Sequence, residues 1–541
     1  MRSPGNDNAT LLGGNGQLKI AGAGPRRPEF VLRVCLAAPA WVLASCAVGP
    51  DFKRPEAPSI DRYTEAGFPN ATAASAFAHG DPQQFTPGGK LRKQWWGLFK
   101  SDPLDQLIEQ ALRDSPTVAS AQATLRQARQ NLASEAGATW PNVSGQLNIQ
   151  REQFSAASVG QTGTSIFTLY NATINVSYTL DVFGGIRRQL EGLQAQVDNA
   201  GYQLQATYLT LTGNVATTAI REASLRAQIR ATEEIEKLQL DQLGIVERRF
   251  NLGAVTKTDV LSQRTALAQT RANLPPLQRQ LSQLRHLLAL YAGRTPESAG
   301  LPSFELDGLE LPLELPVSVP SELVRQRPDI LSAEALLHAA SAQVGVATAN
   351  QYPQLTLTGN VGSEAVGAGQ LFKSNSSVWG LGAGLLAPIF NGGQLLANRR
   401  AAVGAFDAAA ANYRQVVLAA FANVADSLRA LQTDALALQA QVEAQHQAQD
   451  AFQLASRQFN VGAVSYLALL NSQQQLQQTR IAVVQAQADR FADTVALFQA
   501  LGGGWWNHEE PSPPTPLPPS GRGENGGLAS HFPPDDSDRM H

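Results

Sequence analysis

Cys46 is the residue whose type and context point most directly to covalent chemistry. It ends the run Leu43-Ala44-Ser45-Cys46, in which small residues precede a cysteine as in a bacterial lipobox. At such a site the cysteine is lipidated, for example with palmitate, and becomes the mature N-terminus. Cys35 is a poor alternative, because Arg33 lies two residues before it. The other interpretation is an ordinary cleaved signal that contains a cysteine by chance.

The residues before Cys46 have the organisation of a secretory signal. Three arginines precede an apolar stretch, Val34 to Ala44, that is too short to span a bilayer as a helix. We expect residues 1–45 to be a signal peptide with an N-terminal extension unlike an n-region, and residues 46–94 to be a lipidated arm. Ala47 follows the cysteine, where an Asp would indicate inner-membrane retention, so we expect the outer membrane.

Patterns for catalysis or metal binding are missing from the rest of the sequence. The seven histidines are scattered without the spacing of metal ligands. There is no GxSxG elbow and no Walker loop, and the glycines of GLGAGLL alternate as in a strand. We therefore expect no enzyme activity, no cofactor and no metal site. A net charge of −3 gives no reason to expect a nucleic-acid partner.

The chain is two copies of one unit. FNLGAV at 250–255 returns as FNVGAV at 459–464, a shift of 209 residues, and NVATT at 214–218 returns as NVADS at 423–427. The repeated unit is about 200 residues long, far longer than a solenoid repeat. We predict one half at 95–300, the other at 301–506, and a disordered proline-rich tail at 507–541.

Each half is predicted to read helix, strand, strand, long helix, hinge, helix. Apolar and polar residues alternate in four segments, at 143–150, 174–181, 355–361 and 379–385. No stretch of 18 apolar residues follows Cys46, so a membrane span has to be built from strands that close into a barrel. Four strands cannot close one, which indicates that several chains contribute. A soluble β-sandwich is the alternative interpretation.

The predicted long helices run without proline from Gly185 to Phe250 and from Gly393 to Phe459, each reaching about 100 Å at 1.5 Å per residue. Apolar residues between Val417 and Val442 alternate spacings of four and three, which is typical of a coiled-coil seam. An ordinary coiled-coil rod would show the same spacing. The strands that lead directly into each helix favour a channel.

The repeated hinge is predicted to be a helix–helix turn. Gly253 and Gly462 suit the left-handed position after a helix, and Thr256 and Ser465 suit the N-cap of the returning helix. The two turns are expected to expose the apolar pairs Ala254-Val255 and Ala463-Val464 to a partner.

With these features in place, the sequence resembles the outer membrane factor family, the TolC-like efflux outer-membrane lipoproteins. The matching motifs are LASCAVGPDFKRPE, WWGLFKSDPLDQLIEQAL, SYTLDVFGGIRRQ, APIFNGGQ and the two FNxGAV hinges. The resemblance implies an α+β membrane protein. As a homotrimer, its duplicated helix-strand-strand-helix-helix halves would form a twelve-stranded outer-membrane β-barrel continuous with a periplasmic α-helical barrel. It also implies contact with outer-membrane lipid, a periplasmic adaptor and an inner-membrane transporter of the resistance-nodulation-division type.

The resemblance also implies roles for particular residues. The hinges would dock the adaptor through Phe250, Asn251, Leu252, Gly253, Ala254, Val255, Thr256, Phe459, Asn460, Val461, Gly462, Ala463, Val464 and Ser465. Leu467 would be an apolar constriction of a periplasmic gate. Asn471 stands where relatives often carry an Asp, so a trimer of this chain would lack three carboxylates at that level. Asp259 is a candidate for an acidic ring nearby, or else an ordinary helix N-terminal acid.

The resemblance therefore implies the exit duct of a tripartite efflux pump that passes small molecules such as drugs or toxic compounds. Two alternatives stay open at this point. One is the outer channel of a type I protein-secretion system, and the other is a structural coiled-coil lipoprotein without a pore.

Overall fold

The computed structural model describes residues 47–507, except residues 61, 65, 66, 68, 156–159, 161, 298 and 299. Cys46, the predicted signal and the predicted tail beyond Asn507 lie outside the described residues. The described chain divides into two compact units. We call one the strand unit, which holds residues up to Ala57, Ala119–Leu204 and Asp329–Ala419. The helix unit holds Pro58–Val118, Gln205–Pro328 and the residues from Ala420 onward.

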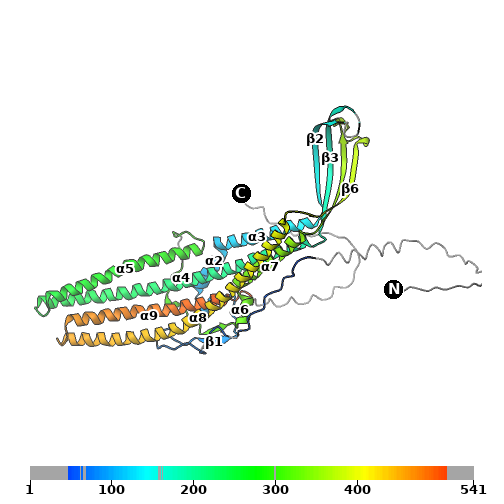
Figure 1. Ribbon diagram of the computed structural model, residues 1–541. Coiled ribbons are helices and arrows are strands. Elements are labelled where there is room, and N and C mark those ends of the chain that lie inside the picture. The colour runs from blue at the N-terminus through cyan, green and yellow to red at the C-terminus, as the bar shows by residue number, and fades with distance from the viewer. Residues whose placement is uncertain are drawn as a thin grey trace, which may run out of the picture. The chain divides into compact units, whose positions relative to one another are not determined.

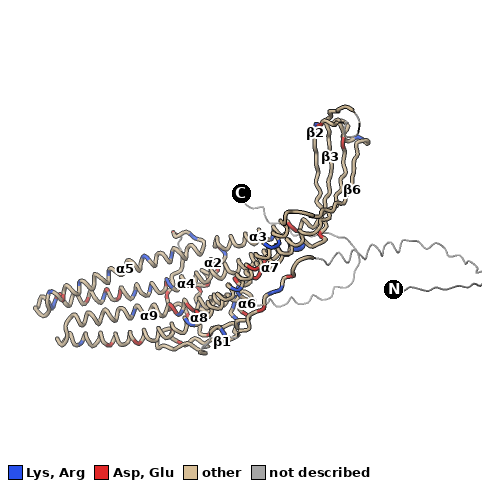
Figure 2. Tube along the Cα trace, in the orientation of Figure 1, with Lys and Arg blue, Asp and Glu red and all other residues tan. Residues whose placement is uncertain are grey.

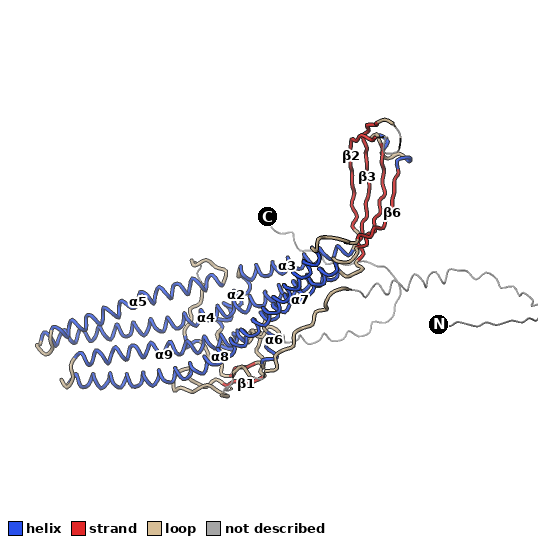
Figure 3. Tube along the Cα trace, in the orientation of Figure 1, coloured by secondary structure: helices blue, strands red, loops and turns tan. Residues whose placement is uncertain are grey.

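The predicted order of elements is confirmed in both halves (Figures 1 and 3). The first half contains α3 (Pro116–Ala136), β2 (Asn142–Ser155), β3 (Thr164–Leu180), α4 (Gly185–Asn251) and α5 (Lys257–Tyr291). The second half contains α7 (Pro328–Ala349), β5 (Gln354–Ala365), β6 (Ser377–Leu386), α8 (Gln394–Asn460) and α9 (Tyr466–Ala500). Shorter helices α2 (Asp102–Asp114) and α6 (Pro320–Gln326) precede α3 and α7. Each long helix, α4 and α8, has 67 residues.

The strand unit contains one antiparallel sheet in the order β2-β3-β5-β6. Its register pairs Asn142 with Ser177, Tyr178 with Leu357, and Leu357 in turn with Ala383. Among the described residues, β2 and β6 each pair with a single neighbour, so the sheet has two open edges. The strands hold 14, 17, 12 and 10 residues, and each is longer than the alternating segment predicted for it.

Charge is confined to one end of this sheet (Figure 2). The charged residues of the four strands are Arg151 and Glu152 on β2 and Glu364 on β5. Arg151 pairs with Thr168, Glu152 with Phe167 and Glu364 with Asn171, so all three lie opposite the first half of β3. The rest of the sheet is uncharged, and large apolar side chains such as Leu147 and Leu381 are exposed on it. A sheet surface with exposed apolar side chains and almost no charge is typical of a sheet in apolar surroundings.

Helix α7 is the one described helix that is long and apolar enough to cross a membrane by length and composition. Half of its apolar 18-residue segment is buried against the rest of the protein, as in a core helix.

The predicted coiled-coil seam of α8 is buried. Its members Val417, Phe421, Val424, Leu428, Leu431, Ala435 and Leu438 are all buried, and Val442 is half-buried. In the helix unit an aromatic cluster joins the segment before α2 to α9. Trp95 lies 5.6 Å from Phe498 and Phe99 lies 6.2 Å from Phe491, measured between ring centroids. These rings are among the largest buried side chains, and their burial ties the N-terminal segment to the last helix.

A small parallel sheet in the helix unit was not predicted. Strand β1 (Gln84–Pro87) pairs with β4 (Glu314–Val317), and each has only four residues and a proline, which leaves no periodic signal in the sequence. The arm before β1 is fastened to α9 by Arg490, which is 1% exposed. The Arg490 guanidinium donates to the carbonyls of His79 at 2.7 Å and Asp81 at 3.0 Å. Burial lowers the pKa of Arg490.

Asp434 on α8 generates a prediction about pH. Burial, followed by the hydrogen bond to Asp493 and the charge of that neighbour on α9, raises the pKa of Asp434 to about 8. The folded state therefore binds a proton that the unfolded chain releases near pH 4, so the free energy of unfolding falls as pH rises from about 4 to 8. We expect Asp434→Asn to stabilise the protein at pH 8 by about 1–2 kcal/mol, less than the full shift implies because the carboxyl is partly solvated.

The measurement is the midpoint of thermal unfolding at pH 5 and pH 8. Asp434→Asn should raise the midpoint at pH 8 more than at pH 5. Asp426→Asn, at an exposed position of the same helix, is the matched control. Equal pH dependence in both variants would contradict the account.

Candidate functional site

The two helix hairpins end in turns built as predicted. Gly253 and Gly462 have φ of 72° and 76°, so the left-handed glycines are confirmed. The Thr256 hydroxyl accepts a hydrogen bond from the Asp259 amide, and the Asp259 carboxylate accepts one from the Thr256 amide, which completes a capping box. Ser465 caps α9 by accepting from the Ala468 amide at 3.3 Å. Both predicted N-caps are therefore confirmed.

The apolar surface of the turns differs from the expectation. Ala254 and Ala463 are exposed, but Val255 and Val464 are half-buried, and Val255 packs inward between the hairpins. The prediction of two exposed Ala-Val pairs is therefore wrong for the valines. Larger exposed apolar side chains stand just before the glycines, where Leu252 is 83% and Val461 is 80% exposed. Each of these two residues follows the last residue of its helix, so no further helical turn covers its side chain.

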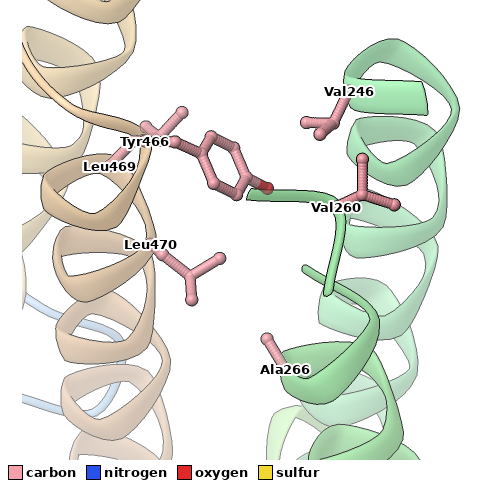
Figure 4. Close-up of a cluster of buried hydrophobic side chains, with 6 residues drawn as sticks. All are labelled: Val246, Val260, Ala266, Tyr466, Leu469 and Leu470. Atoms are coloured by element: carbon pink, nitrogen blue, oxygen red, sulfur yellow. The ribbon is translucent and has the colours of Figure 1, made fainter. Parts of the chain in front are cut away.

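A cluster of apolar side chains joins the two hairpins behind these turns. It consists of Val246 on α4, Val260 and Ala266 on α5, and Tyr466, Leu469 and Leu470 on α9. Figure 4 shows the Tyr466 ring extending from α9 toward Val246 and Val260. Phe452 and Phe459 of α8 pack against its border. The helices α4, α5, α8 and α9 thus all contribute to one apolar cluster near the turns.

Inside this cluster, polar groups also link the hairpins. The buried Tyr466 hydroxyl donates to the Gln263 side-chain oxygen on α5, and the Gln263 amide donates to the Gln239 carbonyl on α4 at 2.7 Å. Burial and, secondarily, the charge of Asp259 raise the pKa of Tyr466, so the hydroxyl keeps its proton and stays a donor. Arg249 of α4 adds a bond of 3.1 Å to the Asn460 side chain and lies 5.0 Å from the Phe459 ring centroid. Sequence reasoning missed this linkage.

The three residues expected at a gate fall into two groups. Leu467 and Asn471 are one helical turn apart and exposed, while Tyr466, Leu469 and Leu470 of the same segment are buried in the cluster. Asp259 is half-buried, and its carboxylate accepts 2.8 Å hydrogen bonds from the Thr256 amide and hydroxyl. This geometry supports the interpretation of Asp259 as a helix N-terminal acid, because its Oδ2 atom is engaged in the capping box.

The arm that follows Cys46 is seated in the strand unit. The Val48 amide donates to the Phe183 carbonyl at 3.1 Å, just after β3 ends. Arg188, nearly buried, pairs with Asp51 at 2.5 Å and with Glu191 at 2.7 Å. A Cβ on Gly49 would lie 2.6 Å from the Gly345 Cα, so only glycine allows the arm this close to α7. These contacts fix the position of Ala47, the residue next to Cys46, beside the end of a strand.

Comparison with known proteins gives a consistent answer. A family model for outer membrane efflux proteins matches residues 107–294 and 319–503. The chain is 33% identical over 460 residues to the pyoverdine export outer membrane protein OpmQ of Pseudomonas putida, covering 83% of this chain and 94% of that relative. It is 31% identical over 474 residues to the probable efflux pump outer membrane protein TtgC of the same species, covering 87% and 95% respectively.

Solved structures resemble the chain over most of its length. The outer-membrane channel OprN matches with a TM-score of 0.76 at 28% identity, covering 85% of this chain and 100% of that one. The open state of the MtrE outer membrane channel of Neisseria gonorrhoeae matches with a TM-score of 0.73 at 25% identity, covering 85% and 99%.

Removing the Tyr466 hydroxyl should loosen the link between the hairpins. Tyr466→Phe keeps the ring but leaves the buried Gln263 oxygen without its donor, which typically costs about 1–3 kcal/mol. We expect a lower midpoint of thermal unfolding and faster amide exchange around 460–470. Tyr352→Phe, whose ring stacks on Phe183 in the strand unit, is the matched control and should change neither quantity. Indistinguishable variants would show that the hydroxyl does not hold the hairpins together.

Proposed function

The chain belongs to the outer membrane efflux protein family, and we propose that three copies of it form the exit duct of a tripartite efflux pump. Its relatives are outer-membrane components of efflux pumps, and this chain is an outer-membrane efflux channel. The proposal adds the homotrimer, a periplasmic adaptor, and an inner-membrane transporter of the resistance-nodulation-division type. It also adds small toxic molecules as cargo and a role that is not enzymatic.

The observation that carries the proposal is the open, largely uncharged sheet. Four strands per chain cannot close, and their apolar side chains are exposed in the single chain. A bilayer tolerates strands only when every backbone donor and acceptor is paired, which a closed barrel achieves. Three chains would supply twelve strands, with β6 of each chain pairing with β2 of the next. The two long helices that follow the strand pairs would then line a periplasmic tunnel.

Lipidation of Cys46 fits this arrangement. The seating of Ala47, Val48 and Gly49 against Phe183 and Gly345 holds the residue next to Cys46 close to the end of β3. A strand that crosses the bilayer ends at the bilayer surface. A lipid attached to Cys46 would therefore enter the leaflet at whose surface β3 ends. The lipid would anchor the duct in the outer membrane and fix the arm before the strands close.

The hairpin turns are the surface we assign to the adaptor. Leu252 and Val461 are exposed apolar side chains at the ends of α4 and α8, and the cluster behind them holds the turns rigidly. Exposed apolar anchors on a rigid frame are the usual energetic centre of a protein interface. The polar residues of the same turns, Asn251, Thr256, Asn460 and Ser465, would form its rim.

The type I secretion channel is the second candidate. The names of three relatives state export of pyoverdine, efflux of toluene and efflux of cations, and none of them names a protein as cargo, which favours efflux. Membership of the outer membrane efflux protein family favours a channel over the coiled-coil rod without a pore.

The adaptor surface can be tested by two substitutions. Leu252→Asp combined with Val461→Asp puts charge where an apolar contact is expected, and we predict that adaptor binding weakens about tenfold or more. Binding is measured with the purified adaptor encoded beside the transporter, and export by drug susceptibility of a strain that lacks its own channel. Leu436→Asp, at an exposed position in mid-α8, is the matched control. Equal loss in the control would mean that the turns have no special role.

The gate is tested through Asn471. With Leu467 as an apolar constriction, closure is steric, and the parent channel should conduct little and ignore divalent cations. Asn471→Asp adds one carboxylate per chain, and we expect block by millimolar divalent cations in planar bilayers while the basal conductance stays small. Leu467→Ala should raise the basal conductance instead. A large basal conductance of the parent protein would contradict this account of the gate.

A further inference from the structure

A cavity of about 560 Å³ opens in the helix unit where the described chain ends. Four aromatic side chains contribute to its wall beside polar ones: the buried Trp95 and Trp96 come from the segment before α2, Tyr208 from α4, and Trp505 from the residues after α9. Its size lies within the range of about 300–1,000 Å³ that is usual for ligand sites. None of the residues assigned above to the sheet, the turns or the gate lines this cavity.

The last described residues hold the exit of the chain at the rim of this cavity. Gly502, Gly503 and Gly504 all adopt positive φ and turn the chain back after α9. A Cβ on Gly503 would lie 2.4 Å from Leu209, and one on Gly504 would lie 2.4 Å from the Leu91 carbonyl. The Trp505 indole donates to the Gln326 carbonyl at 2.9 Å, and the Asn507 amide donates to the Leu91 carbonyl at 2.7 Å. Trp505 and Asn507 are therefore both held by side-chain hydrogen bonds to backbone carbonyls.

The sequence that follows Asn507 is chemically suited to the cavity. Residues 511–519 read PSPPTPLPP, with six prolines in nine positions. Such a segment favours the polyproline II conformation, which docks into aromatic-lined grooves at little cost in conformational entropy. Three residues lie between Asn507 and Pro511, and the four steps along the chain reach at most about 14 Å, so the first prolines stay within range of the cavity.

Charge matches as well. Glu509 and Glu510 lie between Asn507 and the prolines, and Lys90, Arg92 and Lys93 flank Leu91, to which Asn507 is bonded. All three cations are exposed, and none of them forms an ion pair within the part of the chain that the structure describes. Lys93 also lines the cavity. Because Glu509 and Glu510 follow Asn507 in the sequence, this basic cluster would be the first charged surface that they meet.

We propose that the proline-rich segment 511–519 of the same chain docks into the aromatic cavity formed by Trp95, Trp96, Tyr208 and Trp505, steered there by Glu509 and Glu510. Because both partners belong to one chain, the effective concentration is high, and even a weak contact stays occupied. The docked segment fastens α2, α4 and the end of α9 to one another from outside. A neighbouring copy of the chain is the competing occupant of the cavity.

The test compares three proteins purified in detergent: the full chain, a chain truncated after Asn507, and a full-length chain with the six prolines of 511–519 replaced by alanine. Hydroxyl-radical footprinting with mass spectrometry reports the solvent exposure of Tyr208 and Trp505. In the full chain we expect oxidation of both to be about twofold or more slower than in either variant, because rings against a polyproline helix lose much of their exposed area. Trp379, exposed on β6, is the internal control and should be oxidised equally in all three.

Adding a synthetic peptide of residues 508–520 to the truncated chain should restore the protection, and a peptide with Lys at 509 and 510 should restore less. Equal oxidation of Tyr208 and Trp505 in all three proteins would overturn the proposal, whether the cavity is open or covered by a neighbouring copy. Protection that is lost on truncation but kept in the alanine variant would also overturn it, because the tail would then bind without its prolines.

Discussion

The constraint on which the rest of this structure depends is the unpaired backbone along β2 and β6. A sheet of four strands leaves one row of donors and acceptors open at each edge, and an apolar medium makes each unpaired group cost several kcal/mol. The face of the same sheet is apolar and largely uncharged, so it belongs in such a medium. These two facts are compatible only when other strands complete the edges. Because each pair of strands leads directly into a long helix, closing the strands also gathers the helices.

The two halves of the chain repeat one order of elements, and they differ at the turns of their helix hairpins. Both hairpins use a left-handed glycine and a hydroxyl N-cap. Only the first has a complete capping box, because Asp259 faces Thr256 there. Only the second begins its return helix with Tyr466, where the first has Lys257. That tyrosine reaches from the second hairpin into the first, so the two copies are joined by a residue that they do not share.

Much of the fold could be predicted because short local sequence patterns determine it. Alternation located the strands, the absence of proline located α4 and α8, and glycine with Thr or Ser located the turns. What sequence reasoning missed depends on long-range contacts. Arg490 bonds to carbonyls some 410 positions away, and Gln263 reaches α4 and α9 together. The strands β1 and β4 are too short for a pattern. The valines of the turns were misplaced because burial between the hairpins is not visible in either hairpin alone. The break in the repeat at Tyr466 was the one signal in the sequence that marked the cluster.

The most direct test of the account is the mass of the complex. The protein is extracted from outer membranes in mild detergent and weighed by light scattering with the detergent contribution subtracted. If the open edges of β2 and β6 are completed by other copies of the chain, the protein mass is three times that of the mature chain. A monomer or dimer of full activity would contradict it, because four or eight strands of this chain would then have to satisfy their edges without the closure described here.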